Sequence, residues 1–301
     1  MVKFQVDFGP TQDPIDEAAI AAMLARRPRR MMLSREWQAP LHEPREAEKD
    51  WSLVLPFCET LRNSFKSMCS TTTNIGLRAS KGDRCFTFFP GAQKGDESLT
   101  EVERWLATVG KYVAIRDCLA LSFALDYDRE GGAPSKPQTA IGALRSRAKP
   151  YDAAPTADTR RAADELVKHL RAFLKEMTCY NGAEAVCAMP PSRPDKAFDL
   201  PSYLVAGIAS KTKLADITAA VRTVTARPAL KDAEVSRKLA LLKDTIEIDA
   251  AAMKGKVVLL VDDLYQSGVS MNYVGMLLLG AGAKKVFGLA VEKTCRNDAN
   301  V

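Results

Sequence analysis

Two adjacent acidic residues, Asp262 and Asp263, directly follow the apolar run Val257–Val261. A short apolar run of this kind is typical of a buried strand in a parallel sheet. The segment Gln266–Ser270 then combines one glycine with two serines where a helical pattern begins. Free backbone N–H groups at the start of a helix suit a phosphate, and neighbouring carboxylates suit sugar hydroxyls or a divalent cation. The segment therefore predicts a phosphate cradle beside a polar ligand site.

Three other interpretations compete with a phosphate cradle in this part of the chain. A strand ending in Val-Asp-Asp is also typical of a Walker B element, but the sequence lacks the G-x-x-x-x-G-K-[ST] loop that works with it. The glycines Gly280 and Gly282 follow a predicted helix rather than a strand, so they indicate a helix end and not a dinucleotide-binding loop. Ser267 could simply cap a helix beside solvated acids. We favour the cradle because all of its parts occur together.

The predicted elements around this segment alternate between strand and helix. Strands are expected at 183–189, 221–224, 245–248, 257–261 and 285–291, and helices at 200–209, 234–242 and 269–280. Such alternation predicts a parallel sheet with right-handed crossovers. Ligands of parallel sheets bind beyond the carboxyl ends of the strands, and Asp262 lies at the carboxyl end of the strand predicted at 257–261.

The first part of the chain has a more mixed pattern. Strands are expected at 2–8, 85–89 and 120–127, with a hairpin at 81–83, and helices at 15–27, 56–68, 98–109, 139–149 and 158–177. Ser98 and Glu101 have the spacing of a capping box. Gly, Pro and Ser dominate residues 131–137, which is typical of a boundary. We therefore predict an N-terminal mixed α/β region at 1–130 and an α/β domain with a parallel-sheet core at 131–301.

Composition limits the classes of function. The 301 residues carry a net charge of +6 and 47% hydrophobic residues, which is ordinary for a globular protein and permits an anionic ligand. Two histidines offer little material for a histidine-based hydrolase or metal site. The seven cysteines include no C-x-x-C pair, which argues against a zinc ribbon and favours reduced thiols.

No apolar run approaches the roughly 18–20 residues that a membrane helix needs. The alternating start of the chain is unlike a signal peptide. These features predict a soluble, cytoplasmic protein without a membrane partner. The segment Arg26–Arg35 contains five arginines and no acid, and a solvated or linker face is the favoured interpretation. The alternative is a contact with nucleic acid or a protein partner.

The motif resembles the phosphoribosyl-pyrophosphate (PRPP) loop of phosphoribosyltransferases, in which an apolar strand and two acids precede Thr-Thr-Gly-x-Thr. This chain has Gln266-Ser267-Gly268-Val269-Ser270, so glutamine replaces the first threonine. The segment Ala281–Val286 is similar to ComF-type members of that family. Ala185–Pro191, followed by Arg193 and Lys196, is similar to the family's first core strand and pyrophosphate loop. The resemblance is strongest over 254–293 and does not reach 1–130, where a ComF-like zinc cluster of cysteines is absent.

The resemblance implies a type I phosphoribosyltransferase fold for the core and a role for each matching residue. Asp262 and Asp263 would be catalytic, bind the ribose of PRPP and contact Mg²⁺, directly or through the ligand. The remaining implied contacts are with the 5′-phosphate, at Tyr265, Gln266, Ser267, Gly268, Val269 and Ser270, and with pyrophosphate, at Ser192, Arg193 and Lys196.

The implied activity is binding of PRPP or a nucleotide 5′-phosphate, with transfer of ribose 5-phosphate to an unidentified acceptor by a glycosyltransferase reaction. The alternative is a non-catalytic sensor of PRPP or nucleotides that is linked to DNA uptake, repair or defence. Hydrolysis of a nucleotide glycosidic bond is a third hypothesis, and a homodimer is compatible with each.

Overall fold

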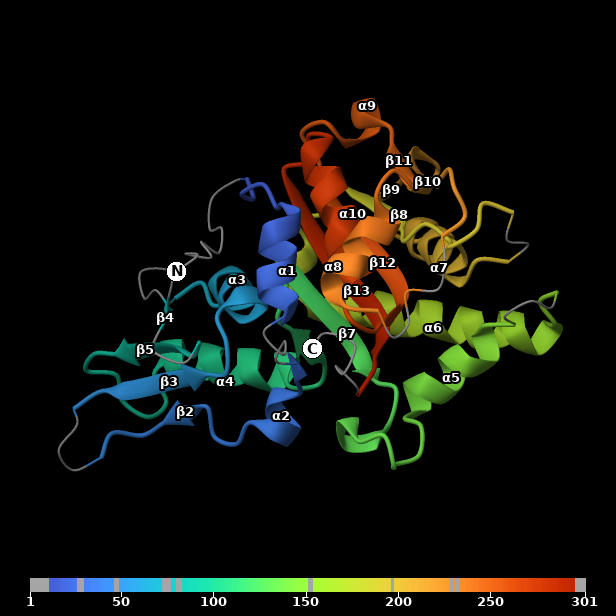
Figure 1. The fold of residues 1–301 in the computed structure, drawn as a ribbon. Helices are drawn as coiled ribbons and strands as arrows, with labels where there is room; N and C mark the ends of the chain where they lie inside the picture. The colour runs from blue at the N-terminus through green and yellow to red at the C-terminus, as the bar shows by residue number, and fades with distance from the viewer. Residues whose placement is uncertain are drawn as a thin grey trace.

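The computed structural model describes residues 11–25, 30–45, 49–71, 77–79, 83–150, 154–195, 198–227, 230 and 233–295. The predicted strand at 2–8 lies outside these ranges. The architecture is mixed α/β, with a largely parallel central sheet and a second, antiparallel sheet (Figure 1). Within the described ranges, no helix has the length and apolar character to cross a bilayer.

The central sheet has seven strands in the order β1-β6-β7-β13-β12-β8-β9. Its parallel strands are β7 (Leu121–Tyr127), β13 (Lys285–Lys293), β12 (Val257–Tyr265), β8 (Ala185–Ala188) and β9 (Ala215–Asp216). The antiparallel strands β6 (Val113–Ile115) and β1 (Arg30–Met31) extend it beyond β7. The sheet thus takes strands from both sides of residue 131, and the domain boundary there stays a prediction.

The order of the strands reverses between β8 and β12. After β8 the chain passes through α7 (Leu200–Ala209) to β9, which lies outward of β8. After β12 it passes through α10 (Val269–Gly280) to β13, which lies on the other side. A reversal of this kind opens a crevice at the carboxyl ends of the two central strands, which is where ligands of open α/β sheets bind.

Helices cover both faces of this sheet (Figure 1). One face packs against α5 (Ala140–Ala148), α6 (Ala157–Glu176) and α7. The other face packs against α1 (Glu17–Ala25), α8 (Val235–Leu242) and α10. A two-stranded ribbon, β10 (Val221–Thr223) with β11 (Ile246–Ile248), and the short helix α9 (Ala250–Met253) complete the connection from β9 to β12.

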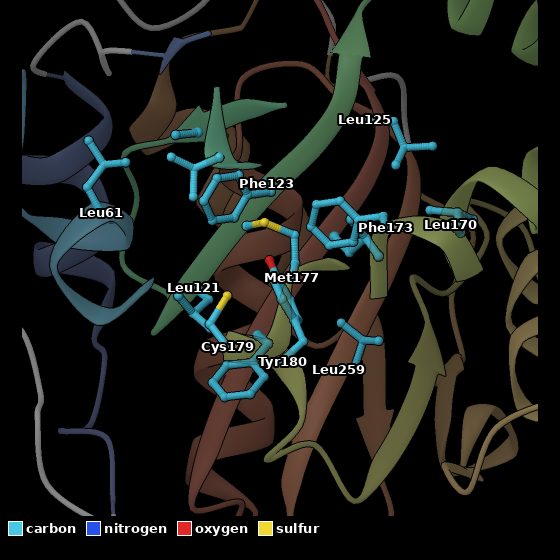
Figure 2. Close-up of a cluster of buried hydrophobic side chains, with 14 of the residues drawn as sticks. Leu61, Leu121, Phe123, Leu125, Leu170, Phe173, Met177, Cys179, Tyr180 and Leu259 are labelled. Atoms are coloured by element: carbon cyan, nitrogen blue, oxygen red, sulfur yellow. The ribbon is translucent and has the colours of Figure 1, made fainter. Parts of the chain in front are cut away.

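An aromatic cluster anchors α6 to the sheet (Figure 2). The ring centroids of Phe173 and Tyr180 are 5.3 Å apart, and those of Phe123 and Phe173 are 6.1 Å apart. The Tyr180 hydroxyl donates a hydrogen bond of 2.8 Å to the Gly288 carbonyl, so its buried polar atom is satisfied. Full burial of such side chains is worth about 1.5–3 kcal/mol each. The buried side chains Leu166, Leu170 and Phe173 of α6 thus belong to the same core as the sheet.

The second sheet is antiparallel, in the order β2-β3-β5-β4. Its strands are β2 (Leu41–His42), β3 (Trp51–Leu55), β5 (Cys85–Phe89) and β4 (Arg78–Ala79). The helices α3 (Glu59–Met68) and α4 (Glu97–Val109) pack beside its buried face, where the rings of Phe65 and Trp105 meet at 5.3 Å. The short helix α2 (Leu33–Glu36) precedes β2.

Three sequence predictions were wrong in detail. Helix α4 begins at Glu97, and Glu101 accepts hydrogen bonds of 2.8 Å from the backbone of Ser70 and Thr71, so Ser98 and Glu101 form no capping box. The strand predicted to end at Val261 continues to Tyr265, because its backbone keeps pairing with β13 after the apolar run ends.

The third correction concerns the cysteines. Cys58 and Cys85 form a disulfide between the start of α3 and β5, with their Cα atoms 5.1 Å apart. The prediction of reduced thiols is therefore wrong for this pair, which lie far apart in sequence but meet across the sheet and its helix. The other described cysteines, which form no disulfide, are Cys69, Cys118, Cys179, Cys187 and Cys295.

Candidate functional site

Asp263 lies buried at the end of β12, between the sheet and helix α5. Its Oδ2 accepts hydrogen bonds from Lys149 Nζ at 2.6 Å and Arg145 Nη1 at 3.1 Å. Burial alone would raise the pKa of Asp263, but the cations of Lys149 and Arg145 bring it below its ordinary value. Arg145 also donates from Nε to the buried carboxylate of Glu292 on β13. Asp263 is thus a charged group held by α5.

Local sequence explains how α5 reaches this position. Thr139 caps the helix, because its Oγ1 accepts from the Gly142 N–H at 3.0 Å and donates to the Tyr127 carbonyl at 2.6 Å. A Cβ atom at Gly142 would collide with the Asp128 carbonyl, so glycine permits the close approach of α5 to the end of β7. Arg145 then lies in the last turn of α5, where the helix dipole favours a cation.

Asp262 has a different environment from its neighbour. Successive strand residues face opposite sides, so Asp262 points away from the side that α5 covers. It is half-buried, and its Oδ1 accepts from the Asp263 N–H at 2.8 Å. Burial, followed by the charge of Asp263, raises the pKa of Asp262. Burial lowers the pKa of Arg227, whereas the negative charge of Asp262 opposes this shift. Arg227 therefore lies close enough to Asp262 to interact with its charge.

Arg227 holds the loop that follows β8. Its Nη2 donates to the carbonyls of Pro190 at 2.6 Å and Pro191 at 2.8 Å, and its backbone N–H donates to the Ser192 carbonyl at 2.8 Å. Ser192 and Arg193 are exposed in this loop, and Lys196 lies outside the described residues. The predicted pyrophosphate loop therefore begins after β8, the strand next to β12. The strand order reverses between these two strands, and we call this place the switch point.

The loop after β12 is short and turns sharply. Gly268 has a φ of +83°, a left-handed conformation that glycine adopts without strain, and α10 begins at the next residue. The buried Lys293 donates from Nζ to the Gln266 carbonyl at 2.8 Å, and burial lowers the pKa of this lysine. Gln266 is exposed, and Ser267 and Ser270 are half-buried. The first N–H groups of a helix lack intrahelical partners, so this end of α10 can donate to an anion.

Tyr265 and Val269 lie beneath the loop. The Tyr265 hydroxyl donates to Asp117 Oδ2 at 2.9 Å and accepts from Asn272 Nδ2 at 3.2 Å. A Cβ atom at Gly268 would lie 2.7 Å from Cζ of this ring. Burial raises the pKa of Asp117 to about 6. The side chains of Tyr265 and Val269 are thus buried supports, and their predicted contact with a ligand stays a prediction.

The described residues do not form a metal centre by themselves. No group of three or more His, Cys, Asp or Glu side chains within the described ranges could hold a metal ion. The carboxylate of Asp263 is engaged by two cations, which leaves Asp262 as the acid with exposed surface beside the loop. Mg²⁺ is commonly bound by one or two carboxylates together with substrate phosphates and water. A phosphate ligand would therefore have to supply most of its coordination.

Part of the basic segment Arg26–Arg35 is described. Arg35 lies 3.6 Å from the Asp126 carboxylate, and the Arg30 guanidinium lies 6.0 Å from the centroid of the Tyr127 ring. Both arginines therefore pack beside the end of β7. A partner contact through this segment stays a prediction.

A cavity of about 360 Å³ lies at the opposite edge of the sheet, where β7, β12 and β13 begin. Its lining includes Lys66, Leu121, Cys179, Lys285 and Phe287. Leu121 and Cys179 appear in Figure 2 at the margin of the aromatic cluster. This cavity is separate from the acids, which lie near the carboxyl ends of the same strands.

Sequence reasoning found the acids and the loop but assigned no role to Arg145, Lys149, Arg227 or Glu292. The available signal for Arg227 was a basic residue three positions after a predicted strand. For Arg145 it was a basic residue in the second half of a predicted helix. Neither signal distinguishes a buried partner from a solvated charge.

No family model matches the sequence, and no curated protein matches it. Among solved structures, the chain is similar to a hypoxanthine phosphoribosyltransferase from Staphylococcus aureus, with 17% identity and a TM-score of 0.28 over 42% of this chain. The chain spans 61% of that protein's chain. A likeness of this size supports no conclusion about activity or site residues.

Proposed function

We propose that this protein binds PRPP or a nucleotide 5′-phosphate at the switch point between β8 and β12. One observation carries the proposal: the acids, the glycine loop and the start of α10 lie together where the strand order reverses. This is the position at which open α/β sheets bind ligands. The mildly basic net charge of +6 is compatible with an anionic ligand.

In the proposed complex, the 5′-phosphate lies against the start of α10. It accepts hydrogen bonds from backbone N–H groups around Gly268 and from the hydroxyls of Ser267 and Ser270. Asp262 accepts hydrogen bonds from the ribose hydroxyls. Asp263 contributes indirectly, because its ion pairs with Lys149 and Arg145 fix the end of β12. The diphosphate extends toward the loop that contains Ser192 and Arg193.

The proposed reaction is displacement at the anomeric carbon of ribose. A bond from the acceptor to this carbon forms, and the bond to pyrophosphate breaks, with the electron pair leaving on pyrophosphate. Positive charge that develops on the sugar is stabilised by the carboxylate of Asp262. Mg²⁺, bound with the diphosphate and contacted by Asp262, would neutralise charge on the leaving group.

A non-catalytic sensor is the second candidate function. Asp263 is paired with two cations, so Asp262 is the one acid of the two that keeps exposed surface for a ligand. This arrangement favours a sensor. Gln266 also stands where the phosphoribosyltransferase loop has a hydroxyl residue. Binding without turnover would fit both features.

The test combines calorimetry with a turnover assay. PRPP with Mg²⁺ is titrated into the wild-type protein, Asp262→Asn and the control Glu247→Gln, which removes an exposed carboxylate on β11. We expect Asp262→Asn to weaken binding at least about tenfold, or 1.4 kcal/mol, and the control to bind normally. Equal affinities, or no binding by the wild type, would refute the site. Release of pyrophosphate with a panel of bases then separates a transferase from a sensor.

A further inference from the structure

The antiparallel sheet buries one face and leaves the other face of its described strands accessible. On β3, Trp51, Leu53 and Leu55 are buried in the core, whereas the intervening Ser52 and Val54 are half exposed. On β5 the same alternation leaves Phe88 51% exposed. Among the described residues, Phe88 and Val224 are the large hydrophobic side chains that are exposed.

The register brings further side chains to this outer face. Val54 pairs with Phe86, and Phe86 pairs with Arg78, so these three residues form one row across the sheet. The next row contains Phe88 and its partner Ser52. The rings of Phe86 and Phe88 are 5.7 Å apart and meet edge to face. Two aromatic rings therefore lie side by side next to an arginine.

A third aromatic ring, that of Trp37, lies beside β3 and is partly buried against the core. Trp37 Nε1 donates to the Val54 carbonyl at 3.0 Å, which holds the indole against β3. The guanidinium of the exposed Arg84 lies 5.4 Å from the centroid of the Trp37 ring, a cation–π arrangement.

The charges of this face are cationic. Arg78 and Arg84 are exposed here, and the outward positions of the described strands carry no carboxylate. The nearest described acids along the chain lie beyond the strand ends, where each has a partner. Asp83, next to Arg84, pairs with Arg116 at 3.2 Å, Glu43 pairs with Lys94 at 3.4 Å, and Asp50 accepts from the Gly91 N–H at 3.1 Å. The face thus combines accessible rings with positive charge.

We propose that this face, consisting of Val54, Arg78, Arg84, Phe86 and Phe88, binds single-stranded nucleic acid. Unpaired bases stack on Phe86 and Phe88, and backbone phosphates contact the two arginines. Aromatic residues within a cationic surface are what sequence-tolerant single-strand binding requires. A duplex offers no base faces to these rings, so the proposal commits to single strands. It is independent of the ligand proposed for the switch point.

The test is fluorescence anisotropy of a labelled short oligo(dT) with the full chain at low salt. Phe88→Leu keeps the apolar area but removes the ring, whereas Phe88→Tyr keeps the ring. We expect Phe88→Leu to weaken binding about tenfold, the loss of one stacked base, and Phe88→Tyr to bind like the wild type. Val224→Ala is the matched control, because Val224 is 44% exposed on another part of the chain and should have no effect.

A second measurement tests the arginines. Replacing Arg78 and Arg84 together by alanine should flatten the slope of log affinity against log salt by roughly 1.4, or 0.7 for each phosphate contact. Arg222→Ala, which removes an exposed arginine from β10, should leave the slope unchanged.

Several outcomes would overturn the proposal. The first is that the wild type does not bind at about 100 µM, which is the weak end of non-specific binding. The second is that Phe88→Leu and Phe88→Tyr bind with equal affinity. If a duplex binds as tightly as the single strand and Phe88 variants bind like the wild type, the protein recognises only the charge of the nucleic acid. Light scattering that detects a dimer, dissociated by Phe88→Leu, would instead show that a second copy of the chain occupies this face. Thermal melting confirms that each variant is folded.

Discussion

Replacing Glu292 by glutamine should make the stability of the protein less sensitive to pH. The Glu292 side chain is 2% exposed, and its Oε2 has no hydrogen-bond partner among the described residues. Burial raises the pKa of Glu292 to about 7, although Arg145 opposes the shift. The folded protein therefore holds a proton that the unfolded chain has already released. The contribution of Glu292 is most favourable below the unfolded pKa and is lost as pH rises from 4.5 to about 7.

The magnitude follows from the difference between the two pKa values. A change from 4.5 to about 7 is 2.5 units, which at about 1.36 kcal/mol per unit gives roughly 3 kcal/mol. Asp117 and Asp262 also have raised pKa values, so their contributions have the same sign. The wild type should therefore lose stability between about pH 5 and pH 8, and Glu292→Gln should remove only its own share of that loss.

Urea unfolding at a series of pH values measures this difference. The free energy of unfolding of the wild type, Glu292→Gln and the exposed control Glu247→Gln is compared from about pH 5 to about pH 8. We expect the curve of Glu292→Gln to be the flatter, so that its stability relative to the wild type rises with pH. Parallel curves for the wild type and Glu292→Gln would refute the assignment of a raised pKa to this carboxyl.

Two further substitutions test the supports of the site. Gly268→Ala places a Cβ 2.7 Å from Cζ of Tyr265 in a left-handed conformation, and should cost about 2–4 kcal/mol in thermal unfolding. Gly91→Ala is the control, because Gly91 has a φ of +69° and no atom lies within 4 Å of the added Cβ. It should lose only the free energy that a left-handed alanine costs, and an equal loss of stability in both variants would contradict the predicted clash. Arg145→Met leaves two buried carboxylates without their shared cation and should cost about 3–5 kcal/mol near pH 8, measured in urea. The loss should be smaller near pH 5, where the carboxyls can take up protons, and a loss independent of pH would contradict this reasoning.

Elements with strong local signals could be predicted from the sequence. Helices α7 and α10 match the expected ranges 200–209 and 269–280, because a cap or a glycine loop directly precedes each apolar pattern. The extension of β12 beyond Val261 could not be predicted in the same way. Its polar residues end the apolar run, while the backbone pairing that continues the strand depends on β13, a separate segment of the chain.

The candidate site was predictable only where its parts are contiguous. Asp262, Asp263 and Gly268 form one motif, so their spacing alone indicates a cradle. The groups that set its electrostatics come from distant segments: Arg145 meets Asp263 across 118 positions and Glu292 across 147. In the sequence, each of these charges is indistinguishable from a solvated one on a helix or at a strand end.

The two adjacent acids therefore differ because of what the rest of the chain brings to them. Asp263 faces two cations from α5, which keep it charged and fix it in place. Asp262 lies on the opposite side of the strand and is half-buried, with a raised pKa and with Arg227 nearby. Two acids that look alike in the sequence thus differ in the structure, because Arg145 of α5 and Lys149 directly after it reach Asp263 and fix its carboxylate.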